Sequence, residues 1–331
     1  MGASVARALA LRGRRDVVVF DPRQPGEGST GRAMGGFRLQ HGSALNIELA
    51  RRSRPYFAER ADRVRFRPNG YLYLADTPAM ATELARRAEF QESCGVPIDH
   101  PDPTRLVPGL KVDDVHASNY CSQDGVYMPA LILQCLVEEG RAAGVTFRYG
   151  SKATAADLAG AEAVVIAAGV WSGEVGRSLG VRLGVEPLAR AVWFAGPFDW
   201  LPDSIPMTLD AESGYHFRER DGRLLVMGPG DQDEWEHYRE WLTRRLPRAA
   251  VAEPESHWKG DYEVTFDHHA LVGATERDGV WACTGFSGHG VMQAPIVGEC
   301  LAAMILGDAP PLDIAALDPL RSEGLVDLTQ L

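Results

Sequence analysis

The first residues of the chain, MGASVARALALRGRRDVVVFD, constrain its fold more than any other stretch. Ala3 to Arg12 is a run of mostly small and aliphatic residues closed by Gly13, which predicts a short helix. Asp16 to Asp21 is a β-branched run between charges, which predicts a buried strand. A helix followed by a buried strand is half of a βαβ unit, so we expect a parallel α/β sheet.

This half unit matches part of a dinucleotide-binding fingerprint, in which G-x-G-x-x-G opens the helix and an acid about 20 positions on holds the ribose. Gly2 suits the third glycine, which lets the helix pack tightly on the sheet, and Asp21 suits the acid. We therefore expect that Met1 is an internal methionine of a G-x-G-x-M-G segment and that the natural protein carries a further strand upstream. The alternative is that Gly2 is merely the second residue of an unrelated helix.

Length and composition limit the class of protein. A chain of 331 residues that is 45% apolar suits one large or two ordinary domains. Its net charge of −11 argues against nucleic acid as a partner. Five scattered cysteines without a CxxC pair predict no disulfide framework and favour a cytoplasmic location. The longest apolar stretch, Val280 to Leu306, contains His289 and Glu299, so we expect no membrane span.

Parallel and antiparallel signals alternate along the chain. Ala161 to Gly169 (AEAVVIAAG) predicts a buried parallel strand, whereas Pro68 to Asp76 predicts a turn and an alternating strand. Tyr215 to Met227 predicts a hairpin that turns at Asp221-Gly222. Gln232 to Leu246 predicts an amphipathic helix whose core stripe is Trp235, Tyr238, Trp241 and Leu242. A nucleotide-binding domain interrupted by an antiparallel layer explains this interleaving.

Four longer segments follow one another in a characteristic order. They are GEGSTGRAMGGFRLQ (Gly26 to Gln40), VVIAAGVWS (Val164 to Ser172), DYEVTFDHHALVG (Asp261 to Gly273) and GFSGHGVMQAP (Gly285 to Pro295). Together they resemble the D-amino-acid oxidase superfamily of FAD-dependent oxidoreductases. Within that superfamily the chain is most similar to the branch of the sarcosine oxidase beta-subunit and dye-linked L-proline dehydrogenase.

The resemblance implies a mixed α/β fold in which a Rossmann-like FAD-binding domain is interrupted by an antiparallel-sheet substrate domain. The expected FAD-binding domain comprises residues 1–66, 122–186 and 266–331, with its first strand missing. The expected substrate domain comprises residues 67–121 and 187–265.

The motifs also predict where FAD binds. Hydroxyls and N–H groups around Ser29 would meet phosphate, Gly35-Gly36 would let backbone lie against a flat ring, and the helix after Gly285 to Gly290 would direct its dipole at the flavin. Each motif also has a purely structural explanation. It is a surface turn for the glycines around Ser29 and at Gly35-Gly36, tight helix packing for Ala167 to Gly169, and an ordinary loop for Gly285 to Gly290. The predicted FAD-binding residues are Gly2, Asp21, Pro22, Ser29, Thr30, Arg32, Gly35, Gly36, Ala168, Gly169, Trp171, Gly285, Gly288, His289, Gly290, Val291 and Met292.

Oxidation of an amine through flavin needs a neutral substrate nitrogen, a C–H bond against flavin N5 and a dry pocket. The predicted catalytic residues are Tyr215, Tyr262, His269, His289 and Met292. Adjacent histidines on a strand point to opposite faces, so one of His268 and His269 is expected to be structural, and no metal site is predicted.

Positions at which this chain differs from its relatives narrow the predicted mode of flavin attachment and the candidates for binding the substrate carboxylate. Gly260 stands where some relatives attach flavin through cysteine, and Arg32 where others use histidine, so FAD should be non-covalent. Tyr262 and Met292 stand where relatives bind the substrate carboxylate with arginine and lysine. The arginines left as candidates for a carboxylate clamp are Arg38, Arg190 and Arg218.

These observations predict an FAD-dependent oxidoreductase that oxidises the C–N bond of an amine or amino acid, preferably a secondary amine or imino acid, to an imine by hydride transfer to flavin N5. The electron acceptor is left open among oxygen, a quinone and a partner subunit. The sequence also leaves open whether the chain forms a hetero-oligomer. The alternatives are a non-catalytic, flavoprotein-like assembly or interaction subunit, and a flavin-free relic if the truncated start is real.

Overall fold

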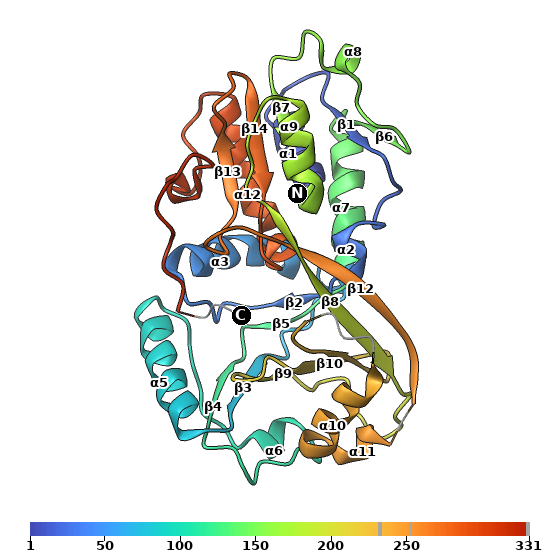
Figure 1. The fold of residues 1–331 in the computed structure, drawn as a ribbon, viewed down its shortest axis with the longest axis vertical. Coiled ribbons are helices and arrows are strands. Elements are labelled where there is room, and N and C mark those ends of the chain that lie inside the picture. Colours follow the sequence, from blue (N-terminus) through green and yellow to red (C-terminus); the bar gives the residue numbers. More distant parts are fainter. Residues whose placement is uncertain (231–233, 252, 329–331) are drawn as a thin grey trace.

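The computed structural model describes residues 1–230, 234–251 and 253–328. Figure 1 shows two parts: a lower part built on one large sheet, and an upper part in which helices surround smaller sheets. The long strands β8 (Glu186–Ala195) and β12 (Pro254–Val264) run from the large sheet toward the upper part. The fold is the mixed α/β fold that the sequence predicts.

The large sheet has seven strands in the order β12-β8-β11-β10-β9-β3-β4. The remaining strands are β3 (Tyr71–Ala75), β4 (Ala117–Cys121), β9 (Met207–Asp210), β10 (His216–Arg220) and β11 (Arg223–Met227). Only β3 and β9 pair in parallel; the other described neighbours in this sheet are antiparallel. The predicted hairpin is confirmed, since β10 and β11 are joined at Asp221-Gly222, both with positive φ.

One face of the large sheet forms the main core of the lower part. Side chains alternate between faces along a strand, so Leu72, Phe217 and Leu224 point to the same side, where they pack against helix α10 (Trp235–Arg245). The predicted stripe of α10 is confirmed, because its four apolar residues are all buried. The other helices of this part are α5 (Pro78–Ser93), α6 (Pro103–Leu106) and α11 (Pro247–Ala250).

The opposite face of the large sheet carries polar and aromatic side chains. Arg190 pairs with Gly260, and Met227 pairs with both Val192 and His216, so these side chains share one face. By the same register the face holds Tyr71, Tyr73, His216, Arg218, Met227, Arg190 and Tyr262. We call this set the polar face. It is directed at the upper part.

The upper part contains two small sheets on either side of a gap. β1 (Val18–Asp21) pairs in parallel with β6 (Thr146–Tyr149). β7 (Val164–Ile166) pairs in parallel with β14 (Val280–Thr284), which pairs antiparallel with β13 (Leu271–Ala274). A short pair, β2 (Gly36–Phe37) and β5 (Gly125–Val126), lies between the two parts. No strand among the described residues joins β1 to β7, so the expected Rossmann-like sheet is divided.

Helix α1 (Gly2–Leu11) packs on α12 (Gly290–Ile305) and α7 (Pro129–Ala142). The close contact is at Gly298, where a Cβ would clash with Ser4, whose hydroxyl donates to the carbonyl of Ala294 at 2.6 Å. A Cβ at Gly2 would only touch that of Ala167, at 3.6 Å. Gly2 thus lies against the end of β7 at ordinary contact distance, and the contact of α1 that requires a glycine is the one with Gly298 of α12.

The remaining helices are short except for α3. They are α2 (Ser29–Arg32), α3 (Ala44–Ala58), α4 (Ala61–Val64), α8 (Ala155–Leu158), α9 (Ser172–Ser178) and the 3-10 turns η1 (Gly169–Trp171) and η2 (Ala315–Leu317). Within the described ranges, no helix combines the length and the apolar character needed to cross a bilayer.

Candidate active site

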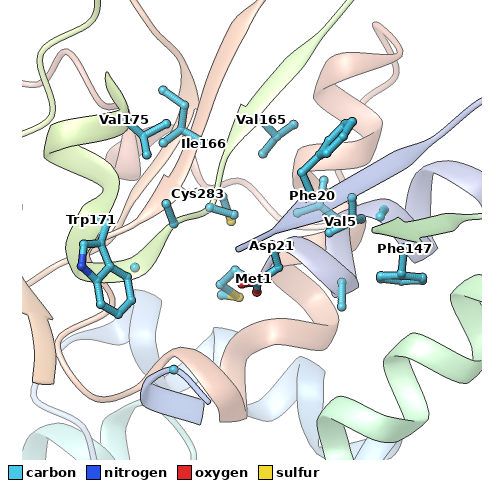
Figure 2. A pocket seen from close by; sticks show the side chains of 18 of the residues that line it. Met1, Val5, Phe20, Asp21, Phe147, Val165, Ile166, Trp171, Val175 and Cys283 are labelled. Atoms are coloured by element: carbon cyan, nitrogen blue, oxygen red, sulfur yellow. The ribbon is translucent and has the colours of Figure 1, made fainter. Parts of the chain in front are cut away.

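A cavity of about 1890 Å³ occupies the gap between the two small sheets and continues to the large sheet. Figure 2 shows Phe20 and Asp21 of β1 on one side of it, and Val165 and Ile166 of β7 on the other. Its far end is lined by Arg190 and other residues of β8 and β12. One continuous space therefore links the upper part to the polar face.

Asp21 lies at the carboxyl end of β1, beside the cavity. One of its carboxylate oxygens accepts the N–H of Arg23 at 2.9 Å. The guanidinium of Arg23 lies 4.0 Å from the centre of the Trp171 ring, so the segments that follow β1 and β7 contact one another. Asp21 thus sits where an acid at a strand end can bind the hydroxyls of a ribose.

The segment containing α2 lines the same cavity but is bound to β12. The Ser29 hydroxyl donates to the carbonyl of Asp261 at 2.9 Å, which ties this segment to β12. A Cβ on Gly260 would lie 3.1 Å from that of Arg32. Gly260 and Arg32, the two positions that relatives use for covalent attachment, therefore lie against each other on the cavity wall.

Gly35 and Gly36 do not line the cavity. A Cβ on Gly35 would clash with the carbonyl of Tyr127, and one on Gly36 with the hydroxyl of Tyr71. Arg218 donates to the carbonyls of Gly35 and Tyr127 at 2.8 and 3.0 Å. The close approach that the glycines permit is thus to protein groups rather than to the expected flavin ring.

The loop between β14 and α12, which we call the late loop, reaches the cavity at Phe286 and Gly288, and the first turn of α12 reaches it at Gly290 and Val291. A Cβ on Gly288, whose φ is +87°, would lie 2.9 Å from the ring of Tyr262. The Tyr262 hydroxyl donates to the sulfur of Met227 at 3.6 Å. The structure therefore brings Tyr262 and the late loop together, although they belong to different parts of the molecule.

Glu263 is a cavity residue that the sequence analysis missed. Its carboxylate accepts hydrogen bonds from the Thr284 hydroxyl at 3.1 Å and from the N–H of Phe286 at 3.3 Å. Burial raises the pKa of this carboxyl. Alternation along β12 places Glu263 on the face opposite to Tyr262, so the strand pattern alone gives no signal for it. Glu263 fixes the start of the late loop.

Arg38 joins the polar face to the N-terminus of α12. It donates to the Tyr73 hydroxyl at 2.7 Å and lies 2.7 Å from Nε2 of His289. Because an arginine only donates, Nε2 of His289 accepts, and the ring is neutral. Burial and then Arg38 lower the pKa of His289 to about 3. His289 itself does not line the cavity, although both of its neighbours do.

Three other predicted catalytic residues also lie outside the cavity lining. The Tyr215 ring stacks on Trp241, 5.5 Å away, within the core of the lower part. His269 is buried in the turn between β12 and β13, where its Nδ1 lies 2.9 Å from the carbonyl of Asp267. His268-His269 is therefore not on a strand, and the expected alternation does not apply. Met292 is buried in the core of the upper part.

The predicted residues fall into two sets. Those that line the cavity are Gly2, Asp21, Pro22, Ser29, Thr30, Arg32, Ala168, Gly169, Trp171, Tyr262, Gly288, Gly290 and Val291. Those that do not are Gly35, Gly36, Tyr215, His269, Gly285, His289 and Met292. In the described part of the chain, no group of three or more potential ligands is placed to hold a metal ion.

Parallel strands that end beside an elongated cavity, together with a polar sheet face at its far end, define a two-part protein that binds a nucleotide cofactor. The family model described as FAD dependent oxidoreductase (DAO) matches residues 1–304. The chain belongs to this family. It is an FAD-dependent oxidoreductase, and FAD is its cofactor.

Individual relatives agree with this assignment. The chain is 27% identical over 354 residues to FAD-dependent oxidoreductase domain-containing protein 1 of Bos taurus, covering 84% of this chain and 72% of that protein. It is 26% identical over 376 residues to mitochondrial dimethylglycine dehydrogenase of Mus musculus, covering 97% of this chain but only 43% of the relative. The crystal structure of L-proline dehydrogenase from P. horikoshii has the same fold, with a TM-score of 0.86 at 23% identity, covering 96% of this chain and 93% of that one.

The residues around the cavity fit FAD. Asp21 places a carboxylate, the group that binds ribose hydroxyls in such folds, beside the cavity, and Gly2 and Ala3 begin helix α1, whose first N–H groups are of the kind that attracts phosphate. The small residues Ala168 and Gly169 at the end of β7 leave room for a nucleotide. The late loop supplies further backbone groups nearer the large sheet.

Proposed function

We propose that this FAD-dependent oxidoreductase oxidises the C–N bond of an amine or amino acid to an imine, with a secondary amine or imino acid as preferred substrate. The observation that carries this proposal is the contact of Tyr262 with Gly288 of the late loop, since the cavity meets the polar face there. Residues at this junction can touch both a substrate on the polar face and a ring bound by the late loop.

The relatives support this substrate class. Dimethylglycine dehydrogenase and L-proline dehydrogenase are both named for amino acids with a substituted nitrogen. The chain spans 43% of the length of dimethylglycine dehydrogenase, so we extend the substrate class alone to this chain.

We infer that Asp21 binds the ribose hydroxyls of FAD, that the start of α1 binds the pyrophosphate, and that Gly288, Gly290 and Val291 contact the flavin ring. FAD, when bound, supplies N5 as hydride acceptor. The partly buried Tyr262 and the buried Met227 exclude water from the reacting C–H bond. As the hydride leaves, the nitrogen lone pair forms the C=N bond and the N–H proton passes to solvent.

We infer further that FAD is held without a covalent bond. Gly260 and Arg32 offer no nucleophile to flavin. Cys283 lines the cavity, but burial raises the pKa of its thiol to about 12, so little of the reactive thiolate forms at neutral pH. The five described cysteines are all free thiols, which suits the proposed cytoplasmic location.

Anaerobic reduction of the bound flavin tests the proposal. The protein loaded with FAD is mixed with N-methylglycine or L-proline, and the absorbance of oxidised flavin is followed. We expect bleaching by at least one of the two, and release of free FAD when the protein is precipitated with acid. Reoxidation by oxygen or by a quinone then identifies the electron acceptor.

Two results would contradict the proposal. Flavin that binds but is not bleached by any amine would favour the non-catalytic interaction subunit. A protein that binds no FAD at all would favour the flavin-free relic.

A further inference from the structure

We propose that Arg190 binds the carboxylate of the substrate, so that the substrate is an N-substituted amino acid rather than a simple amine. This inference rests on the proposed function and names the residue that selects its substrate class. Three arginines, Arg38, Arg190 and Arg218, lie on or against the polar face. The three arginines differ in the protein groups to which they are already hydrogen-bonded.

Arg218 and Arg38 are engaged by the protein. Arg218 is buried and donates to the carbonyls of Gly35 and Tyr127, so it holds the segment before β2. Arg38 is buried between Tyr73 and His289. Neither residue lines the cavity, and a ligand would have to displace these partners to reach them.

Arg190 lies in the cavity lining, where β8 meets β12. Within the part of the chain that the structure describes, its one hydrogen bond is to the carbonyl of the adjacent Ala189, at 3.1 Å, and its guanidinium lies 5.7 Å from the centre of the Tyr262 ring. Among the described residues, no carboxylate lies within ion-pair distance of it. Arg190 is thus a half-buried cation whose forked donors are available to a ligand.

The surroundings of Arg190 favour a small anion. The residue paired with it across the strands is Gly260, so no side chain from β12 covers that position, and the side chain that lies against Gly260 is another cation, Arg32. His216 on the same face is neutral at pH 7, because burial, with Arg38 and Arg190 adding to it, lowers its pKa to about 4. A partly buried positive charge without a counterion is unfavourable, and a substrate carboxylate would neutralise it.

Arg32 also lines the cavity and makes no ion pair among the described residues, but it is exposed. Water screens an exposed charge, so Arg32 gains less from a bound carboxylate. Arg190 is therefore the better candidate for the clamp.

A cation in this place could instead stabilise negative charge on reduced flavin, and the experiment separates the two roles. FAD-loaded wild-type protein and Arg190→Gln are reduced anaerobically by N-methylglycine and by N-methylethylamine, which lacks the carboxylate. We expect Arg190→Gln to raise the concentration of N-methylglycine needed for half-maximal reduction by about 10- to 100-fold. Reduction by N-methylethylamine should change little.

A binding measurement without turnover provides a second readout. Pyrrole-2-carboxylate is titrated into the oxidised protein, and its Kd is taken from the change in the flavin spectrum. We expect a Kd about 10- to 100-fold higher in Arg190→Gln. Arg190→Lys should recover part of the affinity, because lysine keeps the charge but lacks the two parallel N–H donors of a guanidinium. Arg223→Gln is the matched control, because Arg223 is on the same sheet, is paired with Glu255 at 2.8 Å and does not line the cavity.

The outcomes are distinguishable. If wild-type flavin is reduced by amines and Arg190→Gln leaves both the carboxylate Kd and the preference for N-methylglycine unchanged, the clamp is elsewhere. If Arg190→Gln slows both amines equally and shifts the flavin reduction potential, Arg190 serves the flavin and the inference is wrong. If no amine reduces wild-type flavin, the proposed function itself fails.

Discussion

The lower and upper parts of the molecule are stabilised in different ways. The lower part has seven paired strands and a core between the sheet and α10. The upper part has sheets of two and three strands, separated by a cavity of about 1890 Å³. The core of the lower part therefore lies against one continuous sheet, whereas the core of the upper part lies mainly between helices α1, α3, α7 and α12.

Two aspartates, one in each part, show a related contrast. In the lower part, Asp210 accepts hydrogen bonds from Arg245 and from the indole of Trp241, both at 2.7 Å, and it is fully buried. In the upper part, Asp21 is partly exposed, and one of its oxygens accepts a backbone N–H. A buried acid with such partners is structural, while a partly exposed acid beside a cavity is available to a ligand.

The largest expected effect tests the lower part. Asp210→Ala removes the fully buried counterion of Arg245, leaves Arg245 with the less buried Asp114 and Asp76, and takes away the acceptor of the Trp241 indole, so we expect the free energy of unfolding to fall by about 3–5 kcal/mol. Chemical denaturation measures this loss, which should be equal with and without FAD. The double variant Asp210→Leu with Arg245→Met should lose less than Asp210→Ala, because the buried arginine is removed together with its buried partner.

Arg239→Ala is the control for this prediction. Arg239 pairs with Glu236 on the exposed side of α10, so its loss should change stability by no more than about 1 kcal/mol. Equal losses from Asp210→Ala and Arg239→Ala would remove the distinction between the two parts.

The next effect tests the upper part. FAD at a hundred times its Kd should raise the free energy of unfolding by about 2.7 kcal/mol, because FAD binds only the folded chain.

Asp21→Ala should raise the Kd of FAD by about 10- to 100-fold through loss of a charged hydrogen bond, as measured by titration of FAD fluorescence. Asp308→Ala, an exposed acid outside the cavity lining, should leave the Kd unchanged. An unchanged Kd in Asp21→Ala would show that the ribose binds elsewhere.

The smallest expected effect concerns the polar face between the two parts. The folded pKa of His216, about 4, lies below its usual value near 6.5, so its contribution to stability is lost as pH falls from 6.5 toward 4. We expect the wild-type free energy of unfolding to fall by about 1–2 kcal/mol more over this range than that of His216→Gln. Denaturation curves at pH 7 and pH 4.5 test this. Equal pH dependence in the two proteins would show that His216 is not buried as a neutral ring.

The sequence predicts elements whose pattern is local. The hairpin at Asp221-Gly222 follows from its turn residues, and the buried stripe of α10 follows from helical spacing. Strand β7 lies within the predicted strand Ala161 to Gly169 and pairs in parallel as expected, because it is a short apolar run that ends in small residues. Asp21 could be placed beside a cavity because the end of a parallel strand is where such folds bind nucleotides.

What the sequence could not predict depends on which distant segments meet. Gly36 is covered by Tyr71 and Gly288 by Tyr262, and neither partner is identifiable from the glycine motif alone. Among the candidate arginines, only the sheet register and the hydrogen bonds of Arg218 and Arg38 single out Arg190. Glu263 was missed for the same reason, since its partners Thr284 and Phe286 lie about twenty residues later.

The length of β12 has a consequence for how the two parts communicate. This strand pairs with β8 along the whole of its length, and its residues Gly260 to Glu263 line the cavity. A substitution that shifts the pairing of β8 with β12 would therefore disturb the polar face and the cavity wall at the same time.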